Sequence, residues 1–149
     1  MGIFENAVIG REQITDYIPQ RFPIVMVDEF FGIEDNVSYS AITVREDNLF
    51  MENGLFNESG ILEHIAQSCA LRVGYICKQE NKPIPIGYIG AVKKMKIFKL
   101  PGVGEKLFTS VRIMQEVFDI TLVTTEVRSL NDTLIASCEM KIFLEPVNV

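Results

Sequence analysis

The sequence holds one long helical pattern, at residues 60–79, in a chain whose other long regular segments look like β-strands. At about 100° per residue, apolar side chains of this pattern fall in one continuous sector: Leu62, Ile65, Ala66, Cys69, Ala70, Val73, Ile76 and Cys77. Ile61, Leu71 and Tyr75 add apolar groups on a second side. We therefore expect a helix that is covered over most of its circumference, with Ser59 as its N-cap.

Strand patterns lie before and after this helix. Residues 11–18 predict a short helix or turn, residues 23–32 a buried strand, and residues 37–46 a half-buried strand with alternating polarity. After the helix, four segments rich in Val, Ile, Thr and Phe are separated by turn signals: 86–98, 106–116, 119–129 and 132–145. Short connections between the last three favour an antiparallel meander. The pattern predicts one α+β domain, residues 1–149, whose sheet wraps the helix.

Composition excludes several functional classes. The net charge of −6 argues against a nucleic-acid binder, which is normally basic. No apolar run reaches the roughly 18 residues that a membrane span needs, so none is expected. The three cysteines show no paired spacing, and the first residues resemble no secretory signal, so we expect a reduced, cytoplasmic protein. No phosphate loop or metal-ligand cluster occurs in the sequence, and we expect no cofactor and no metal.

Three short motifs follow one another along the chain. Residues 18–28 contain Pro19, Arg21, Pro23 and Asp28, with Gln20 between the first two. In residues 62–67, Glu63 is followed four residues later by Gln67. Residues 87–108 end in a Pro-Gly turn and a strand. These motifs resemble the hot-dog-fold β-hydroxyacyl-acyl carrier protein dehydratases over about residues 18–145, although that family usually has His at the position of Gln20.

One departure from the family concerns the loop before the helix. The dehydratases carry a catalytic histidine directly after a glycine, whereas here Gly54 is followed by Leu55. The stretch from Leu55 to Glu63 is also shorter than the family's. The resemblance therefore implies a divergent branch that keeps the acidic residue and lacks the usual histidine.

The chemistry implied by the resemblance assigns roles to the retained motif. Dehydration of a 3-hydroxyacyl thioester needs a base for the proton beside the carbonyl and an acid for the leaving hydroxyl. Glu63 is the candidate acid or acid/base, and Gln67, one helical turn on, is placed to orient its carboxyl group. An acidic residue in the first turns of a helix is also favoured by the helix dipole alone. Both interpretations of Glu63 stay open.

Four further residues are candidates for substrate binding. The reaction needs hydrogen-bond donors for the thioester oxygen, and backbone N–H groups at a helix N-terminus provide such donors. Gly60 and Ile61 lie at that end of the predicted helix. Leu55, at the position of the family's histidine, and Phe31, in an aromatic segment, are expected to line the acyl-binding site.

His64 is the chain's one histidine and stands next to Glu63. Adjacent helix residues point about 100° apart, so the two side chains do not share a face. His64 falls outside the apolar sector together with Ser68, Arg72 and Lys78. We expect an exposed or interface histidine and no catalytic dyad within one chain.

Lys93, Lys94, Lys96 and Lys99 place half of the chain's lysines within seven residues of an acidic protein. One interpretation is an edge strand kept from aggregating by its charge. The other is a docking patch for an acidic partner. The resemblance implies such a partner, acyl carrier protein, and both interpretations stay open.

The function expected from the resemblance is that of a dehydratase-like protein acting on 3-hydroxyacyl thioesters of acyl carrier protein, in fatty-acid or polyene-type lipid synthesis. One alternative is a partner subunit without the histidine, which completes its site beside a second, histidine-bearing chain. Another is a hot-dog acyl thioesterase that works with a helix carboxylate. Because a single hot-dog subunit leaves a sheet edge open, we expect a homodimer or a heterodimer with a dehydratase-like subunit.

Overall fold

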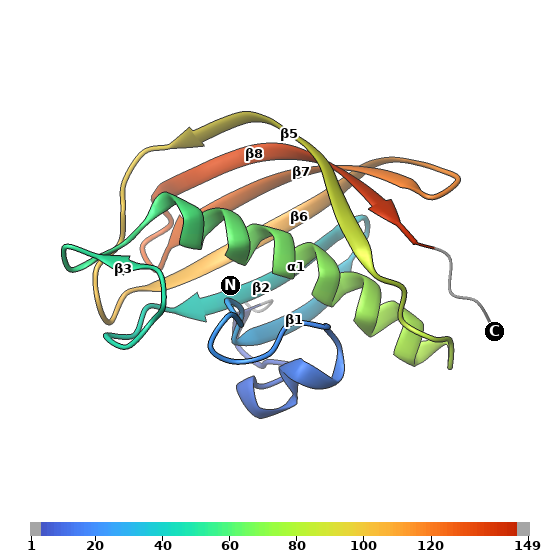
Figure 1. Ribbon diagram of the computed structural model, residues 1–149, viewed down its shortest axis with the longest axis horizontal. Coiled ribbons are helices and arrows are strands. Elements are labelled where there is room, and N and C mark those ends of the chain that lie inside the picture. The colour runs from blue at the N-terminus through green and yellow to red at the C-terminus, as the bar shows by residue number, and fades with distance from the viewer. Residues whose placement is uncertain (1–3, 146–149) are drawn as a thin grey trace.

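The computed structural model describes residues 4–145, and its elements follow the predicted order (Figure 1). A short 3₁₀ helix, η2 (Arg11–Asp16), leads into two strands, β1 (Glu29–Glu34) and β2 (Val37–Thr43). A small hairpin, β3 (Met51–Glu52) and β4 (Leu55–Phe56), precedes the long helix α1 (Glu58–Gln79). Four long strands follow: β5 (Gly87–Ile97), β6 (Lys106–Val117), β7 (Ile120–Ser129) and β8 (Leu134–Leu144). The ends of the predicted domain, residues 1–3 and 146–149, lie outside the described residues.

The long strands form one antiparallel sheet in the order β1-β2-β6-β7-β8-β5. β6, β7 and β8 form the predicted meander, with turns at Phe118 and Asp132, both of which have positive φ. The sheet curves around α1, which crosses one of its faces (Figure 1). The predicted α+β architecture is confirmed.

Two local predictions are wrong. The strand expected over residues 23–32 begins only at Glu29, because the Met26 N–H and carbonyl before it bond to the helix side chains of Gln67 and His64. The N-cap of α1 is Asn57 and not Ser59, since the Asn57 side chain accepts a hydrogen bond from the Gly60 N–H at 2.9 Å. The cap fixes the start of the helix that carries Glu63.

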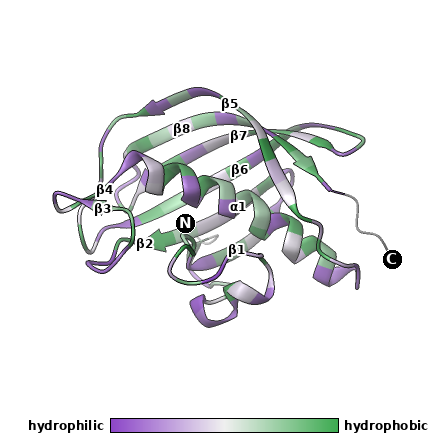
Figure 2. Ribbon diagram, viewed as in Figure 1, coloured by the Kyte–Doolittle hydropathy of each residue, from purple (hydrophilic) through white to green (hydrophobic). Residues whose placement is uncertain are grey.

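The helix is buried between two apolar clusters. Ile61, Ile65 and Cys69 pack against the sheet, while Leu71 packs against the N-terminal segment and Phe30. Burial of such side chains stabilises the fold by roughly 1.5–3 kcal/mol each. Along the strands, hydrophobic and hydrophilic residues alternate (Figure 2).

The predicted apolar sector is only partly the buried face. Its members Leu62, Ala66, Ala70 and Val73 are half-buried, whereas His64 and Ser68, expected outside the sector, are fully buried. Two layers cover the helix, and the side left uncovered lies toward β5, where the cavity described below opens. The hydrophobic pattern of the helix alone does not predict which of its sides the rest of the chain covers.

Candidate active site

Glu63 lines a cavity between α1 and the beginning of β5. The cavity has a volume of about 290 Å³, and the Glu63 side chain is half-buried in it. Its walls come from four parts of the chain: Tyr17, Pro19 and Gln20; Glu63, Ala66, Cys69, Ala70 and Val73; Ile84, Pro85, Gly87, Tyr88 and Ile89; and Ile142 and Leu144. A mostly apolar hollow with a few polar groups is the usual form of a small-molecule site.

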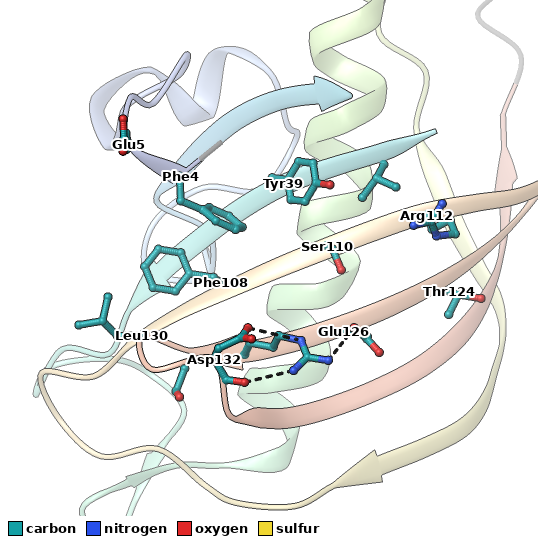
Figure 3. Close-up of a pocket in the computed structure, with 13 residues that line it drawn as sticks. Phe4, Glu5, Tyr39, Phe108, Ser110, Arg112, Thr124, Glu126, Leu130 and Asp132 are labelled. Atoms are coloured by element: carbon teal, nitrogen blue, oxygen red, sulfur yellow. Dashed lines mark hydrogen bonds and ion pairs between the residues drawn. The ribbon is translucent and has the colours of Figure 1, made fainter. Parts of the chain in front are cut away.

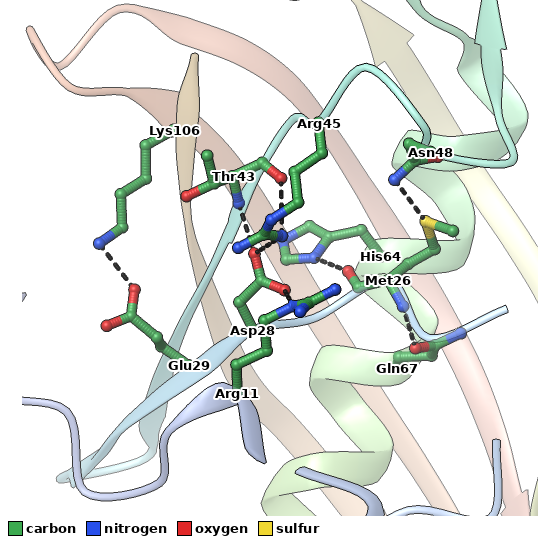
Figure 4. A network of polar contacts seen from close by, with 10 residues as sticks. All are labelled: Arg11, Met26, Asp28, Glu29, Thr43, Arg45, Asn48, His64, Gln67 and Lys106. Atoms are coloured by element: carbon green, nitrogen blue, oxygen red, sulfur yellow. Dashed lines mark hydrogen bonds and ion pairs between the residues drawn. The ribbon is translucent and has the colours of Figure 1, made fainter. Parts of the chain in front are cut away.

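Gln67 holds the carboxyl group of Glu63 in place. Its Nε2 donates to Glu63 Oε2 at 2.8 Å and to the Ile24 carbonyl at 2.9 Å. Its Oε1 accepts from the Met26 N–H at 2.6 Å (Figure 4). The Gln67 side chain is fully buried, so its orientation is fixed by three partners. The hydrogen bond that the predicted orienting role requires is present.

His64 is buried in the core, and the prediction of an exposed or interface histidine is wrong. Its Nδ1 donates to the Met26 carbonyl at 2.7 Å, and its Nε2 accepts from the Thr109 hydroxyl at 2.7 Å. Burial lowers the pKa of His64 from 6.5 to about 4, against a smaller opposing effect of the Met26 hydrogen bond. The imidazole is therefore neutral near pH 7, and both nitrogens are occupied. Within its own chain it has no free nitrogen for a substrate.

The N–H groups at Gly60 and Ile61 are not free. The Gly60 N–H donates to the Asn57 side chain at 2.9 Å, and the Ile61 N–H donates to the Asn57 carbonyl at 3.1 Å. Both residues are buried. The predicted donors for a thioester oxygen are thus used in capping the helix, because the helix begins two residues earlier than expected.

Leu55 and Phe31 do not line the cavity with Glu63. Leu55 is 40% exposed in β4 and forms a bridge with Gly102. Phe31 points to the face of the sheet away from α1, where its ring packs edge to face on Phe4 with 5.1 Å between the ring centroids. Its neighbour Phe30 faces α1 and contacts Tyr75. Alternation along β1 explains the outcome, since successive side chains point to opposite faces. The structure does not bring either residue together with Glu63.

A second, larger cavity of about 870 Å³ lies on the outer face of the sheet, away from α1 (Figure 3). Its walls include Phe4, Tyr39 and Phe108. Arg128 in this cavity is neutralised by Glu126, at 3.2 Å, and Asp132, at 3.9 Å. Its larger volume does not make it the better candidate, because neither Glu63 nor Gln67 lines it.

Asp28 belongs to the first motif, but its surroundings indicate a structural role. Its carboxylate accepts the Thr43 N–H at 2.7 Å and pairs with Arg45 at 2.9 Å and Arg11 at 3.4 Å (Figure 4). The motif's Arg21 donates to the carbonyls of Ile18 and Gln20. These contacts shape the segment that places Gln20 in the cavity wall. Gln20 was not predicted as a site residue, although its position within the first motif is a signal that could have identified it.

Comparison with known families identifies the relatives of this chain. The model of the ApeP-like family, described as ApeP dehydratase, matches residues 12–148. The chain belongs to this family. It is also 31% identical over 110 residues to the 3-hydroxyacyl-[acyl-carrier-protein] dehydratase FabZ of Clostridium botulinum. The aligned region covers 68% of this chain and 72% of that relative.

Solved structures agree on the fold. A chain of the dehydratase heterocomplex ApeI:P from Xenorhabdus doucetiae superposes with a TM-score of 0.77 at 15% identity, covering 89% of this chain and 91% of that one. A hypothetical thioesterase from Streptococcus pneumoniae superposes with a TM-score of 0.65 at 7% identity, covering 91% of this chain and 93% of that one. The hot-dog fold and the dehydratase-like family predicted from the motifs are confirmed.

Among residues 4–145, no group of three or more His, Cys, Asp or Glu side chains is arranged to hold a metal ion. No helix in the same residues is both long and apolar enough to cross a membrane.

Proposed function

We propose that this member of the ApeP-like family is the acid-bearing subunit of a dehydratase for 3-hydroxyacyl thioesters of acyl carrier protein. One observation carries the proposal. Glu63 lines an apolar cavity and is oriented by Gln67, whereas the chain's one histidine has both nitrogens occupied in the core. The site thus has a carboxyl group but lacks the imidazole that usually acts beside it.

The reaction divides naturally between two groups. In dehydration, a base removes a proton from C2 of the acyl chain, and an acid protonates the 3-hydroxyl, which leaves as water. Glu63, in its protonated form, is assigned the second step. In the reverse hydration, the carboxylate takes a proton from the attacking water. The base for C2 is assigned to a second, dehydratase-like subunit that carries the loop histidine.

The relatives support a two-chain arrangement. One structural neighbour comes from a dehydratase heterocomplex. The cavity also lies beside β5, which is an edge of the sheet, so that a second subunit docked there would adjoin Glu63. We place this heterodimer in the cytoplasm and in fatty-acid or polyene-type lipid synthesis. A homodimer of this chain would have two acids and no loop histidine.

The lysine cluster (Lys93, Lys94, Lys96 and Lys99) is assigned to docking of the carrier protein. All four side chains are exposed, on β5 and just beyond it. Only Lys94 forms an ion pair within the described residues, with Glu139 at 3.5 Å. The remaining three charges are available to an acidic partner.

An enoyl-thioester hydration assay tests the proposal. Wild type and Glu63→Gln are measured alone and mixed with a dehydratase-like subunit that carries the loop histidine. We expect activity in the mixture with wild type, and a loss of about 10²–10⁴-fold with Glu63→Gln, the range typical for a general acid. Glu58→Gln, an exposed acid in the first turn of the same helix, is the matched control.

Three outcomes would contradict parts of the proposal. Unchanged activity of Glu63→Gln would remove its catalytic role. Full activity of wild type alone would show that no histidine-bearing partner is needed. Thiol release without hydration, measured on a saturated acyl thioester, would favour the thioesterase alternative.

A further inference from the structure

Gln20 lines the same cavity as Glu63, and its amide has no hydrogen bond to any described residue. Its Oε1 is buried without a partner. A buried polar atom without a hydrogen bond costs about 1–3 kcal/mol, and native proteins leave few such atoms. Within the described residues the amide therefore makes no hydrogen bond that stabilises the fold, and it is available to a ligand.

The backbone around Gln20 is held firmly, independently of its side chain. Arg21 Nη1 donates to the Gln20 carbonyl at 2.9 Å and to the Ile18 carbonyl at 2.8 Å. Three residues before Gln20, the Tyr17 carbonyl packs directly on Gly74 of α1, where even a methyl group would lie only 2.1 Å from its oxygen. The segment is thus fixed against the helix. Its contacts place Gln20 in the cavity wall without any hydrogen bond to the Gln20 side chain.

Few other polar groups in this cavity are free to bind a ligand. The Tyr88 hydroxyl donates to Glu145 at 2.9 Å, and burial raises the pKa of the Cys69 thiol to about 12. Most of the remaining wall is aliphatic. Gln20 and Glu63 are therefore the amide and carboxyl groups that a polar atom of a bound acyl chain would meet.

An amide offers one acceptor and one donor group, and rotation about its last bond exchanges their positions. A 3-hydroxyl group likewise donates and accepts. A saturated acyl chain offers neither near C3. We propose that Gln20 is a positioning residue that binds the 3-hydroxyl of the acyl substrate and presents it to Glu63, so that the cavity selects 3-hydroxyacyl over saturated acyl chains. This assignment rests on the proposed function for the identity of the substrate class.

Binding without turnover tests this inference separately from catalysis. The probes are the amide analogues 3-hydroxyoctanoyl-pantetheine and octanoyl-pantetheine, in which an amide replaces the thioester so that neither is hydrolysed. We expect the wild-type chain to bind the hydroxylated probe about tenfold more tightly, the value of roughly one hydrogen bond. Gln20→Leu, of similar size, should bind both probes equally, and Gln20→His should restore the preference.

A structural role is distinguished by thermal unfolding. Gln20→Leu removes an unsatisfied polar atom, so its Tm should stay the same or rise. A lowered Tm together with loss of binding of both probes would assign Gln20 to the fold and overturn the inference. So would a Gln20→Leu protein that keeps the preference, or a wild type that shows none.

The two proposals fail separately. If hydration depends on Glu63 and Gln20→Leu retains the preference for the hydroxylated probe, only the role of Gln20 is overturned. If the wild-type preference depends on Gln20 and no hydration occurs in any mixture, the binding role stands and the dehydratase function falls.

Discussion

At the scale of single residues, Glu63 and His64 show how one helix serves two environments. Glu63 is half-buried in a cavity and accepts a hydrogen bond from Gln67, whereas His64 is fully buried between Met26 and Thr109. Adjacent helix residues point about 100° apart, so the acid faces the cavity and the imidazole faces the core. The acid is accessible to a ligand and the imidazole contributes to stability.

The buried histidine predicts a specific dependence of stability on pH. The pKa of His64 is lowered to about 4 in the folded chain, whereas the unfolded value is 6.5. The unfolded chain therefore binds the proton first, and stability present above pH 6.5 is lost as pH falls toward 4, with no further loss below that. Between pH 7 and pH 5 this effect amounts to about 2 kcal/mol.

Urea unfolding of wild type and His64→Gln at both pH values measures this effect. The variant is less stable at pH 7, because it alters a buried hydrogen-bonded site, but it should lose about 2 kcal/mol less than wild type on going to pH 5. Groups that do not interact with His64 make the same contribution in both proteins and cancel in the comparison. Equal losses in the two proteins would show that His64 is not protonated on unfolding.

At the scale of elements, α1 is positioned by close contacts as well as by its apolar side chains. A Cβ added at Gly60 would lie 2.5 Å from the Phe56 ring, and one at Gly74 would lie 2.1 Å from the Tyr17 carbonyl oxygen. The first contact sets the helix against β4, and the second sets it against the segment after η2. The second contact therefore holds the cavity wall that begins at Tyr17 against the helix that carries Glu63.

Gly74→Ala should destabilise the protein although alanine is the better helix former. The gain in helix propensity is about 1 kcal/mol. Against it stands overpacking on a backbone carbonyl, which typically costs 1–3 kcal/mol and here meets an atom that cannot rotate away. Because the approach of 2.1 Å is so close, we expect the cost to lie in the upper half of this range, with a net loss of about 1–2 kcal/mol in urea unfolding. Ser59→Ala, at an exposed position of α1, is the control, and an equal or higher stability of Gly74→Ala would contradict the contact.

At the scale of the whole molecule, β5 is an edge strand with two different halves. Residues 87–92 carry no charge, and Tyr88 and Val92 are 54% and 36% exposed. The second half carries the lysine cluster. An exposed apolar edge is a natural site of strand pairing, whereas lysines oppose it. We therefore assign the first half to subunit contact and the second to the carrier protein.

A charge in the first half should weaken subunit association. We expect Val92→Glu to shift the protein toward the monomer in sedimentation velocity, since it places a charge on the apolar pairing edge. Val103→Glu, 53% exposed in the loop after β5, is the control and should leave the assembly unchanged. An unaltered assembly of Val92→Glu with an unaltered Tm would exclude pairing through this half.

Charge reversal of the second half should impair only carrier-bound substrates. For Lys93→Glu/Lys96→Glu/Lys99→Glu, the KM for an acyl carrier protein thioester should rise roughly tenfold at low salt, and the difference should shrink as salt screens the charges. The KM for the same pantetheine thioester should not change. Lys82→Glu, outside the cluster, serves as control, and an equal effect on both substrates would leave the cluster a role in edge protection only.

Local patterns were sufficient for most elements of the fold. The helix and the four strands after it are predicted to within about two residues, because periodicity and turn residues are properties of neighbouring positions. The buried segment before Glu29 was predicted wrongly as a strand, since the Met26 backbone bonds to the side chains of Gln67 and His64, about 40 residues away. The pairing of Glu63 with Gln67 was foreseen from their spacing of one helical turn.

The sequence by itself determined the element order, the dehydratase motifs and the absence of a histidine after Gly54. Only the tertiary structure decided which side of α1 is covered, that His64 is buried and neutral, that Gly60 and Ile61 are used by the Asn57 cap, and that Gln20 lies beside the Glu63 cavity. The physical reason is that a helix wheel gives directions without saying what lies in each. Which side chains are buried is decided only when the sheet and the N-terminal segment pack on two sides of the helix and leave the third side open beside β5.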